Sequence, residues 1–118
     1  MPGRASSRVE LLQGTLDLLI LRTLRAGSAH GHAIAKHIQR TSEDRLQVET
    51  GSLYPALHRL EAKGWIAPSW ELSNKGKRAR FYRLTPLGRR QLAAEQAKWD
   101  AFCSAMALVL KPVDQGAQ

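Results

Sequence analysis

Lysine and arginine gather in one stretch of the chain, and their spacing suits contact with a polyanion. Between Leu72 and Ala94 the sequence holds no Asp or Glu. The same stretch holds seven of the 18 Lys and Arg residues, namely Lys75, Lys77, Arg78, Arg80, Arg83, Arg89 and Arg90. Four of them lie beside Gly76 in a segment with turn chemistry, where side chains project into solvent. A basic loop of this kind can follow phosphates or enter a minor groove, and otherwise it only keeps a protein soluble.

A second set of polar residues recurs on one face of a helix expected at about 50–63. The opposite face of this helix is apolar at positions i, i+3, i+4 and i+7: Leu53, Ala56, Leu57 and Leu60. The outward residues can reach phosphates or base edges: Ser52, Tyr54, Pro55, His58, Arg59 and Lys63. We expect Arg59 to bond guanine and Tyr54 to contact phosphate, with Lys36 of the preceding helix at the backbone. Each of these residues is also ordinary on a solvated helix face.

Histidine and cysteine are the residues most open to a catalytic or metal-binding interpretation, and their spacing supports neither. His32 and His37 are five residues apart, so they do not share a helix face, and no pair of cysteines accompanies them. The sequence offers no arrangement typical of a Ser-His-Asp or paired-carboxylate enzyme. We therefore predict no enzymatic activity, no metal and no cofactor. Cys103 is interpreted as a small apolar residue of a core or an interface rather than a redox sensor.

The composition limits where these residues can act. The chain has 118 residues and a mass of 13.1 kDa, which favours one domain. Its net charge of +8 and pI near 10.4 point to nucleic acid, an acidic protein or an anionic membrane surface as partner. The longest apolar runs are 18–21 and 105–110, too short to cross a membrane, and the start of the chain lacks a signal-peptide core. With one cysteine and hence no intrachain disulfide, we expect a cytoplasmic protein.

Hydrophobic periodicity predicts the elements that position the basic residues. The expected order is three helices, a β-hairpin and a long helix: 10–25, about 30–40, about 50–63, strands at 66–72 and 81–84, and 86–110. Pro55 must lie in the first turn of its helix, which makes Ser52 the expected N-cap, and Gly64 suits a left-handed C-terminal cap. Thr85 and Pro86 are the expected N-cap and first residue of the last helix. This order is that of a winged helix-turn-helix, mainly α with a small β-hairpin.

Two helices carry more apolar surface than one small core needs. In 10–25, a second stripe of Leu11, Leu18 and Leu21 predicts a contact with either another subunit or a later helix of the same chain. In 86–110, apolar residues repeat at heptad spacing, which is typical of a helix that packs along its length. We predict a homodimer interface formed by Leu11, Leu18, Leu92, Trp99, Phe102, Met106 and Val109. A small-molecule effector pocket at Trp99 and Phe102 would fit this interface, whereas Trp65 and Trp70 are expected to cover the base of the hairpin.

Four segments carry motifs that occur together in one protein family. They are GTLDLLILRTL at 14–24, HGHAIAKHI at 30–38, GSLYPALHRLEAKGWI at 51–66 and RARFYRLTPLGRRQL at 78–92. With these segments the sequence resembles the short form of the PadR family of bacterial transcriptional regulators. The resemblance implies a homodimer, usually a repressor, bound to an inverted repeat in double-stranded DNA. It maps the recognition helix onto Ser52–Lys63 and the wing onto Trp65–Leu84. In the family an aromatic residue, typically Tyr, follows the glycine that corresponds to Gly31. This chain departs from that pattern, because it has His32 there.

These observations predict a domain plan and two competing functions. The plan is a flexible tail at 1–9, a winged helix-turn-helix domain at 10–85, a dimerisation helix at 86–110 and a second flexible tail at 111–118. The leading hypothesis is a homodimeric repressor that reads an inverted repeat through its third helix and a basic wing. The alternative is a winged-helix interaction module whose basic wing binds an acidic protein.

Overall fold

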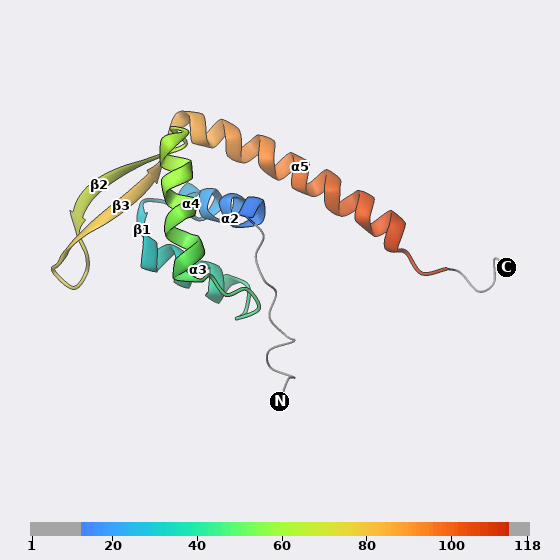
Figure 1. Ribbon diagram of the computed structural model, residues 1–118, viewed down its shortest axis with the longest axis horizontal. Helices are drawn as coiled ribbons and strands as arrows, with labels where there is room; N and C mark the ends of the chain where they lie inside the picture. Colours follow the sequence, from blue (N-terminus) through green and yellow to red (C-terminus); the bar gives the residue numbers. More distant parts are fainter. Residues whose placement is uncertain (1–12, 114–118) are drawn as a thin grey trace.

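Four helices and one antiparallel sheet make up residues 13–113, the range that the computed structural model describes (Figure 1). In chain order they are α2 (Gln13–Arg25), β1 (Ala29–His30), α3 (Gly31–Thr41), α4 (Thr50–Ala62), β2 (Ile66–Leu72), β3 (Arg78–Leu84) and α5 (Pro86–Leu110). The strand order is β1-β3-β2. The prediction of a mainly α winged helix-turn-helix followed by a long helix is confirmed.

The core lies where α2, α3 and α4 meet the base of the sheet. The apolar faces that periodicity predicts are its main components: Leu16, Ile20, Leu24, Ile34, Ile38, Leu53, Ala56, Leu57 and Leu60. Leu21 is fully buried in the same core, and Leu18 packs against it. Helix α5 also packs against α2, and Leu18 lines a groove with Trp99 and Phe102, so this member of the second stripe faces a later helix of the same chain. Leu11, the third member of that stripe, lies outside the described residues.

The start of α4 differs from the prediction. The helix begins at Thr50 with Glu49 as N-cap, not at Ser52, and Pro55 lies inside it. The amides of Ser52 and Leu53 both donate to the Glu49 carbonyl, at 3.0 and 2.9 Å, and this closes the first turn before the proline is reached. Pro55 deprives the carbonyl of Gly51 of its usual i+4 donor. Gly51 is exposed, so water can reach that carbonyl and the helix tolerates the proline.

The end of α4 follows the prediction. Gly64 has φ +76°, in the left-handed region that favours glycine. Its amide donates to the Glu61 carbonyl at 2.9 Å, and the next amide, of Trp65, donates to the Leu60 carbonyl at 3.0 Å. These two bonds are those of a Schellman motif, which satisfies the last carbonyls of the helix and turns the chain into β2.

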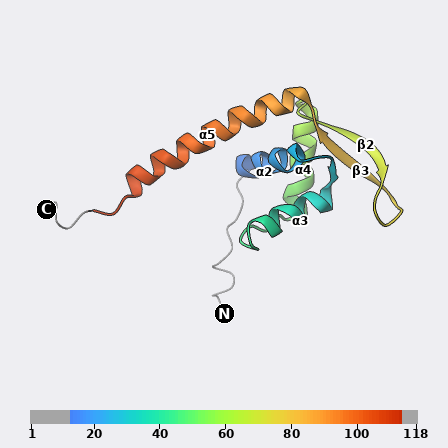
Figure 2. The ribbon, with the colours of Figure 1, turned by 180° about the vertical axis from the view of Figure 1, so that it is seen from behind.

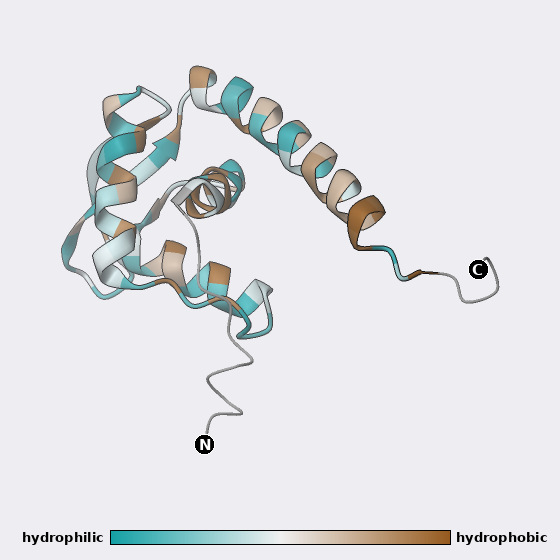
Figure 3. Ribbon diagram, turned by 45° about the vertical axis from the view of Figure 1, so that its right-hand side comes forward, coloured by the Kyte–Doolittle hydropathy of each residue, from teal (hydrophilic) through white to brown (hydrophobic). Residues whose placement is uncertain are grey.

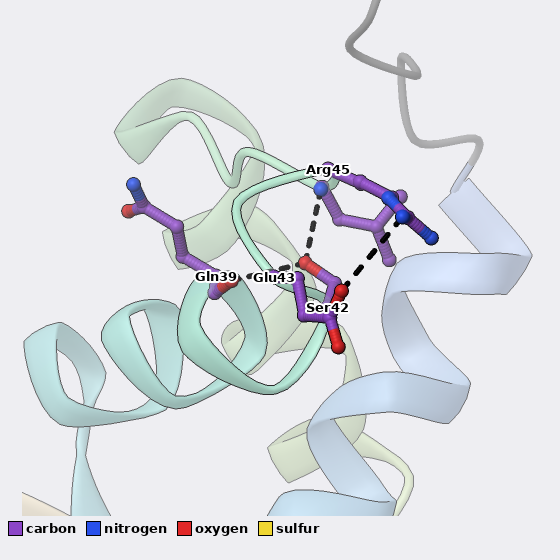
Figure 4. Close-up of polar contacts among 5 residues, drawn as sticks. Gln39, Ser42, Glu43 and Arg45 are labelled. Carbon is purple, nitrogen blue, oxygen red and sulfur yellow. Dashed lines mark hydrogen bonds and ion pairs between the residues drawn. The ribbon is translucent and has the colours of Figure 1, made fainter.

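The connection between α3 and α4 is longer than a tight helix-turn-helix turn, and polar contacts order it (Figure 4). The Ser42 hydroxyl donates to the Gln39 carbonyl at 3.1 Å and accepts from the Leu46 amide at 3.0 Å. Glu43 and Asp44 both have positive φ, at 55° and 66°. The side-chain amide of Gln39 donates to the Asp44 carboxylate at 2.6 Å, which stabilises this unusual turn.

The sheet is larger than the expected hairpin. β2 and β3 pair from Ile66↔Leu84 to Leu72↔Arg78, and the two-residue β1 adds to the other edge of β3. Gly76, with φ +78°, lies in the turn between β2 and β3. The expectation that Trp70 covers the base of the hairpin is wrong, because its side chain is 60% exposed on the outer half of β2, while Trp65 packs against the core.

Helix α5 begins on the body of the domain and then leaves it (Figures 1 and 2). As predicted, Thr85 is the N-cap, with its hydroxyl accepting from the Gly88 amide at 2.9 Å, and Pro86 is the first helical residue. Leu92, expected at a subunit interface, is only 4% exposed and belongs to the core of its own chain. Beyond it the helix is largely exposed, Cys103 included, so this cysteine is not a core residue of the single chain. In residues 13–113 no helix is long and apolar enough to cross a membrane.

Candidate nucleic-acid interface

The wing consists of β2, β3 and the turn that joins them. A groove of about 840 Å³ lies between α3, one face of α4, and the turn and strand β3 of this wing. Six cationic side chains line it: Lys36, Arg40, Lys75, Lys77, Arg78 and Arg80. No Asp or Glu is among the residues that line it. We call this surface the basic groove. It brings together cations that lie 44 residues apart in the chain, from Lys36 to Arg80, and this concentration of positive charge favours a polyanionic partner.

Helix α4 contributes Tyr54 and His58 to the basic groove. The position of Tyr54 depends on a close approach between α4 and the start of α3. A Cβ atom built on Gly31 would lie 2.9 Å from the Tyr54 hydroxyl oxygen and 3.0 Å from its ring. Only glycine therefore leaves room for Tyr54 in this position, and Tyr54 remains 41% exposed at the groove.

The start of α3 is fixed by a histidine rather than by the usual Ser, Thr, Asp or Asn. Nδ1 of the His30 ring accepts a hydrogen bond from the Ala33 amide at 3.1 Å, so His30 is the N-cap of the helix. The ring also meets Phe81 of β3 edge-on, with centroids 5.2 Å apart. His30 thus joins α3 to the sheet. The His32 ring stacks beside the His30 ring, with their centroids 6.4 Å apart. In the part of the chain that the structure describes, three or more potential metal ligands do not gather at any point.

A two-point ion pair ties the wing to α4. The terminal nitrogen Nη2 of Arg80 lies 2.8 and 3.0 Å from the two carboxylate oxygens of Glu61. Its guanidinium also lies 5.9 Å from the centroid of the Tyr82 ring. Burial raises the pKa of the Tyr82 hydroxyl, and the positive charge of Arg80 partly opposes this shift. Arg80 is therefore held in one place at the base of the basic groove.

The side chain of Arg59 lies outside the basic groove. Its Nη2 donates to a carboxylate oxygen of Asp17 on α2 at 2.8 Å, and the Asp17 side chain is only 15% exposed. The Nε atom of Arg59 is buried and has no partner among the described residues. Arg59 therefore connects α4 to α2 and does not line the basic groove.

The sequence-predicted residues divide into two groups. Seven line the basic groove: Lys36, Tyr54, His58, Lys75, Lys77, Arg78 and Arg80. Four do not: Ser52, Pro55, Arg59 and Lys63, the last lying 4.6 Å from the centroid of the Trp65 ring. Sequence reasoning missed Arg40 and His30. Arg40 follows Lys36 by four residues, one helical turn, and this spacing was the available signal; nothing in the sequence marks His30 as a cap.

Comparison with known proteins identifies the family of this chain. Residues 20–94 match the model of the transcriptional regulator PadR-like family. The chain belongs to the PadR-like family. It is 32% identical over 87 residues to the transcriptional regulator Rv3488 of Mycobacterium tuberculosis, an alignment that covers 74% of this chain and 78% of the relative.

Solved structures of PadR-like and other transcriptional regulators share the fold. A PadR family regulator from Eggerthella lenta is similar with a TM-score of 0.72 and 32% identity, covering 86% of each chain. A transcriptional regulator from Clostridium thermocellum has a TM-score of 0.77 at 27% identity, covering 84% of this chain and 96% of that one. The resemblance seen in the sequence is confirmed, and the family is one of DNA-binding transcriptional regulators rather than enzymes.

The PadR-like chain has a second notable surface, on the far part of α5. Apolar side chains are exposed there, including Trp99, Phe102, Met106 and Val109, and Figure 3 shows the hydrophobic colouring of this end of the helix. Trp99 and Phe102, with ring centroids 6.0 Å apart, also line a groove of about 340 Å³ against Leu18 of α2. In the described residues no other element covers the far end of α5.

Proposed function

We propose that this PadR-like regulator is a homodimeric repressor that binds an inverted repeat in double-stranded DNA. The basic groove carries the proposal, since six cations and no Asp or Glu line it, although one of the six, Arg80, is already paired with Glu61 behind it. In each subunit α4 enters the major groove, and the wing reaches the adjacent phosphates or minor groove. Such a protein acts in the cytoplasm, where bacterial DNA lies.

Salt dependence tests the proposal directly. Each phosphate neutralised by Lys or Arg releases counterions, so binding weakens as salt rises. With on the order of four phosphate contacts per subunit, the logarithm of the binding constant should fall with log salt with a slope of about −7 for the dimer. A slope near zero on duplex DNA would exclude this function. Retention of an acidic protein without retention of duplex would favour the interaction-module alternative.

The variant Lys77→Ala tests whether the wing contributes phosphate contacts to this salt dependence. Lys77 lies on the exposed turn of the wing, so its loss should reduce the magnitude of the slope by about one per subunit and weaken specific and random duplexes alike. Lys111→Ala is the control, because Lys111 is equally exposed but follows α5, outside the basic groove. A slope that changes equally in both variants would contradict the assignment of Lys77.

Selection of bound sites from a random duplex library tests the symmetry. A two-fold dimer should return an inverted repeat with half-sites roughly 34–36 Å apart, about one helical turn of DNA. An asymmetric motif with a single half-site would contradict the dimer. Repression itself follows from the family resemblance, and we expect transcription in vitro from a promoter that carries the selected site to fall when the protein is added.

The exposed apolar residues of α5 support the dimer. Trp99 and Met106 lie on one side of the helix, whereas Leu108 lies about half a turn away from Trp99 and is 76% exposed. Met106→Glu should therefore shift the protein towards monomer in sedimentation, while Leu108→Glu, as the matched control, should not. Equal behaviour of the two variants would contradict the proposed seam.

The groove beside Leu18 is our proposed place for a small-molecule effector. Leu18, Trp99 and Phe102 give it apolar and aromatic walls, which suit an apolar or aromatic compound. An effector bound there should change the fluorescence of Trp99 and the affinity for the selected duplex together. A compound that changes the affinity while leaving Trp99 unaffected binds elsewhere.

A further inference from the structure

Two large apolar side chains are exposed on the wing, and the core does not account for them. Trp70 is 60% exposed and Leu72 is 69% exposed, both on β2. β2 is an edge strand, and Pro68 within it lacks a backbone donor. A further β-strand that paired along this edge would lose a hydrogen bond at the proline if that position faced it. The exposed side chains, rather than the strand edge, are the feature that needs a partner.

The strand register places these residues on the same face as the arginines of the basic groove. Trp70 pairs with Arg80, and Leu72 pairs with Arg78. Residues directly opposite each other in an antiparallel pair point to the same side of the sheet. The guanidinium of Arg78 lies 5.7 Å from the centroid of the Trp70 ring. One face of the outer wing therefore alternates apolar and cationic side chains and continues into the basic groove.

The single carboxylate of the two strands lies on the other face. Glu71 pairs with Ala79, and its carboxylate accepts a hydrogen bond from the Ser69 hydroxyl at 2.8 Å. On the face that carries Trp70 the two strands themselves hold no carboxylate between Ile66 and Leu84, and the negative charge next to it is that of Glu61 of α4, paired with Arg80. The face thus combines cations with exposed apolar side chains. The minor groove of DNA matches this combination, because it presents phosphates at its rims and apolar sugar and base surfaces within, whereas the surface of an average protein carries both signs of charge.

We propose that Trp70 and Leu72 form an apolar contact in the DNA minor groove, beside the phosphates held by Arg78. Apolar side chains in minor grooves pack against or between the bases, and nearby cations hold the rims. This inference rests on the proposed DNA-binding function and deepens it. It assigns the wing a contribution to affinity that does not come from charge.

The test follows Trp70 in the full-length protein labelled with 5-fluorotryptophan. The three tryptophans give three fluorine resonances, and the resonance that disappears in Trp70→Phe is that of Trp70. Saturating duplex at low salt should remove most of the difference between the Trp70 shifts in H₂O and D₂O, which reports solvent exposure. The Trp65 and Trp99 resonances serve as internal controls and should change less.

Affinity supplies the second readout. Trp70→Ala should weaken duplex binding about tenfold and leave the salt slope unchanged, because no charge is lost. Trp70→Phe should recover most of the affinity, and Leu108→Ala, which removes an exposed apolar side chain of α5, should have no effect. Circular dichroism should be the same for all variants, since Trp70 does not belong to the core.

The outcomes separate this inference from the function on which it rests. If no duplex is retained at low salt, both fail. If duplex binds with a steep salt slope while Trp70 stays accessible to solvent, or if Trp70→Ala binds as tightly as the natural sequence, only the minor-groove contact is overturned. The exposed face would then be available to a protein partner.

Discussion

The ion pair between Arg59 and Asp17 gives a prediction that separates a structural role for Arg59 from a role in base recognition. The two side chains are joined by one hydrogen bond of 2.8 Å, and they are 32% and 15% exposed. We expect Arg59→Ala to destabilise the fold and to leave the ratio of specific to random duplex affinity unchanged. This expectation contradicts the contact with guanine that the sequence alone predicts for Arg59.

The magnitude follows from the partial burial of the pair. Fully exposed pairs contribute about 0.2–1 kcal/mol, and breaking a fully buried pair costs about 3–5 kcal/mol. A single charge-assisted hydrogen bond contributes about 1.5–3 kcal/mol. For a pair of intermediate burial, we expect a loss of about 2 kcal/mol, or roughly a 30-fold change in the unfolding equilibrium. Arg59→Ala should cost more than Asp17→Ala, because it leaves the more buried partner uncompensated.

A double-mutant cycle measures this coupling. Urea unfolding of the natural sequence, Asp17→Ala, Arg59→Ala and the double variant is compared at one protomer concentration, since dimer formation would add to the apparent stability. The expected coupling is about 1–2 kcal/mol, smaller than the single losses because each variant also removes packing. A coupling near zero, together with a selective loss of specific duplex binding in Arg59→Ala, would refute the structural role and restore the base contact.

Three further predictions concern the fold. Thr85→Ala should lower the free energy of unfolding by about 1 kcal/mol, whereas Thr85→Ser, which keeps the capping hydroxyl, should cost less in the same urea titration. Leu57→Ala should lower it by about 3–4 kcal/mol, because Leu57 is fully buried; a loss below 1 kcal/mol would mean that the core collapses around the cavity. The raised pKa of Tyr82 means that the unfolded chain ionises first, so stability should fall as pH rises above about 10. Tyr82→Phe should remove that part of the alkaline loss, and an unchanged pH profile would contradict the effect of burial on Tyr82.

The helices were predictable because their signals are local. Leu53, Leu57 and Leu60 repeat with the helical period, and the structure buries all three. Gly64 and the Thr85-Pro86 pair mark helix ends by chemistry that acts within a few residues. The clustering of basic residues in the wing was equally visible, since it needs no knowledge of the fold.

The errors arise where distant parts of the chain meet. β1 has two residues, and it forms only because its partners in β3 lie beside it, 51 and 53 positions later in the chain. No local sequence pattern therefore predicts it. Arg59 has the spacing of an outward residue, but its partner Asp17 is 42 positions away. Trp70 looks like a core residue because it is large and apolar. Its exposure depends on how far the wing extends beyond the body, which strand periodicity does not record.

The corner at which α4 ends and α5 begins has a consequence for how far apart two recognition helices can sit. The Thr85 hydroxyl donates to the Gly64 carbonyl at 2.7 Å, and the Thr85 amide donates to the Trp65 carbonyl at 3.1 Å. A Cβ atom on Gly88 would lie 2.0 Å from the Trp65 carbonyl oxygen, so the two segments are in direct contact. These contacts therefore fix the start of α5 relative to the end of α4. In the proposed dimer, a change in the angle at which the two α5 helices cross would therefore change the distance between the two α4 helices along the DNA. Neither winged-helix domain would have to rearrange.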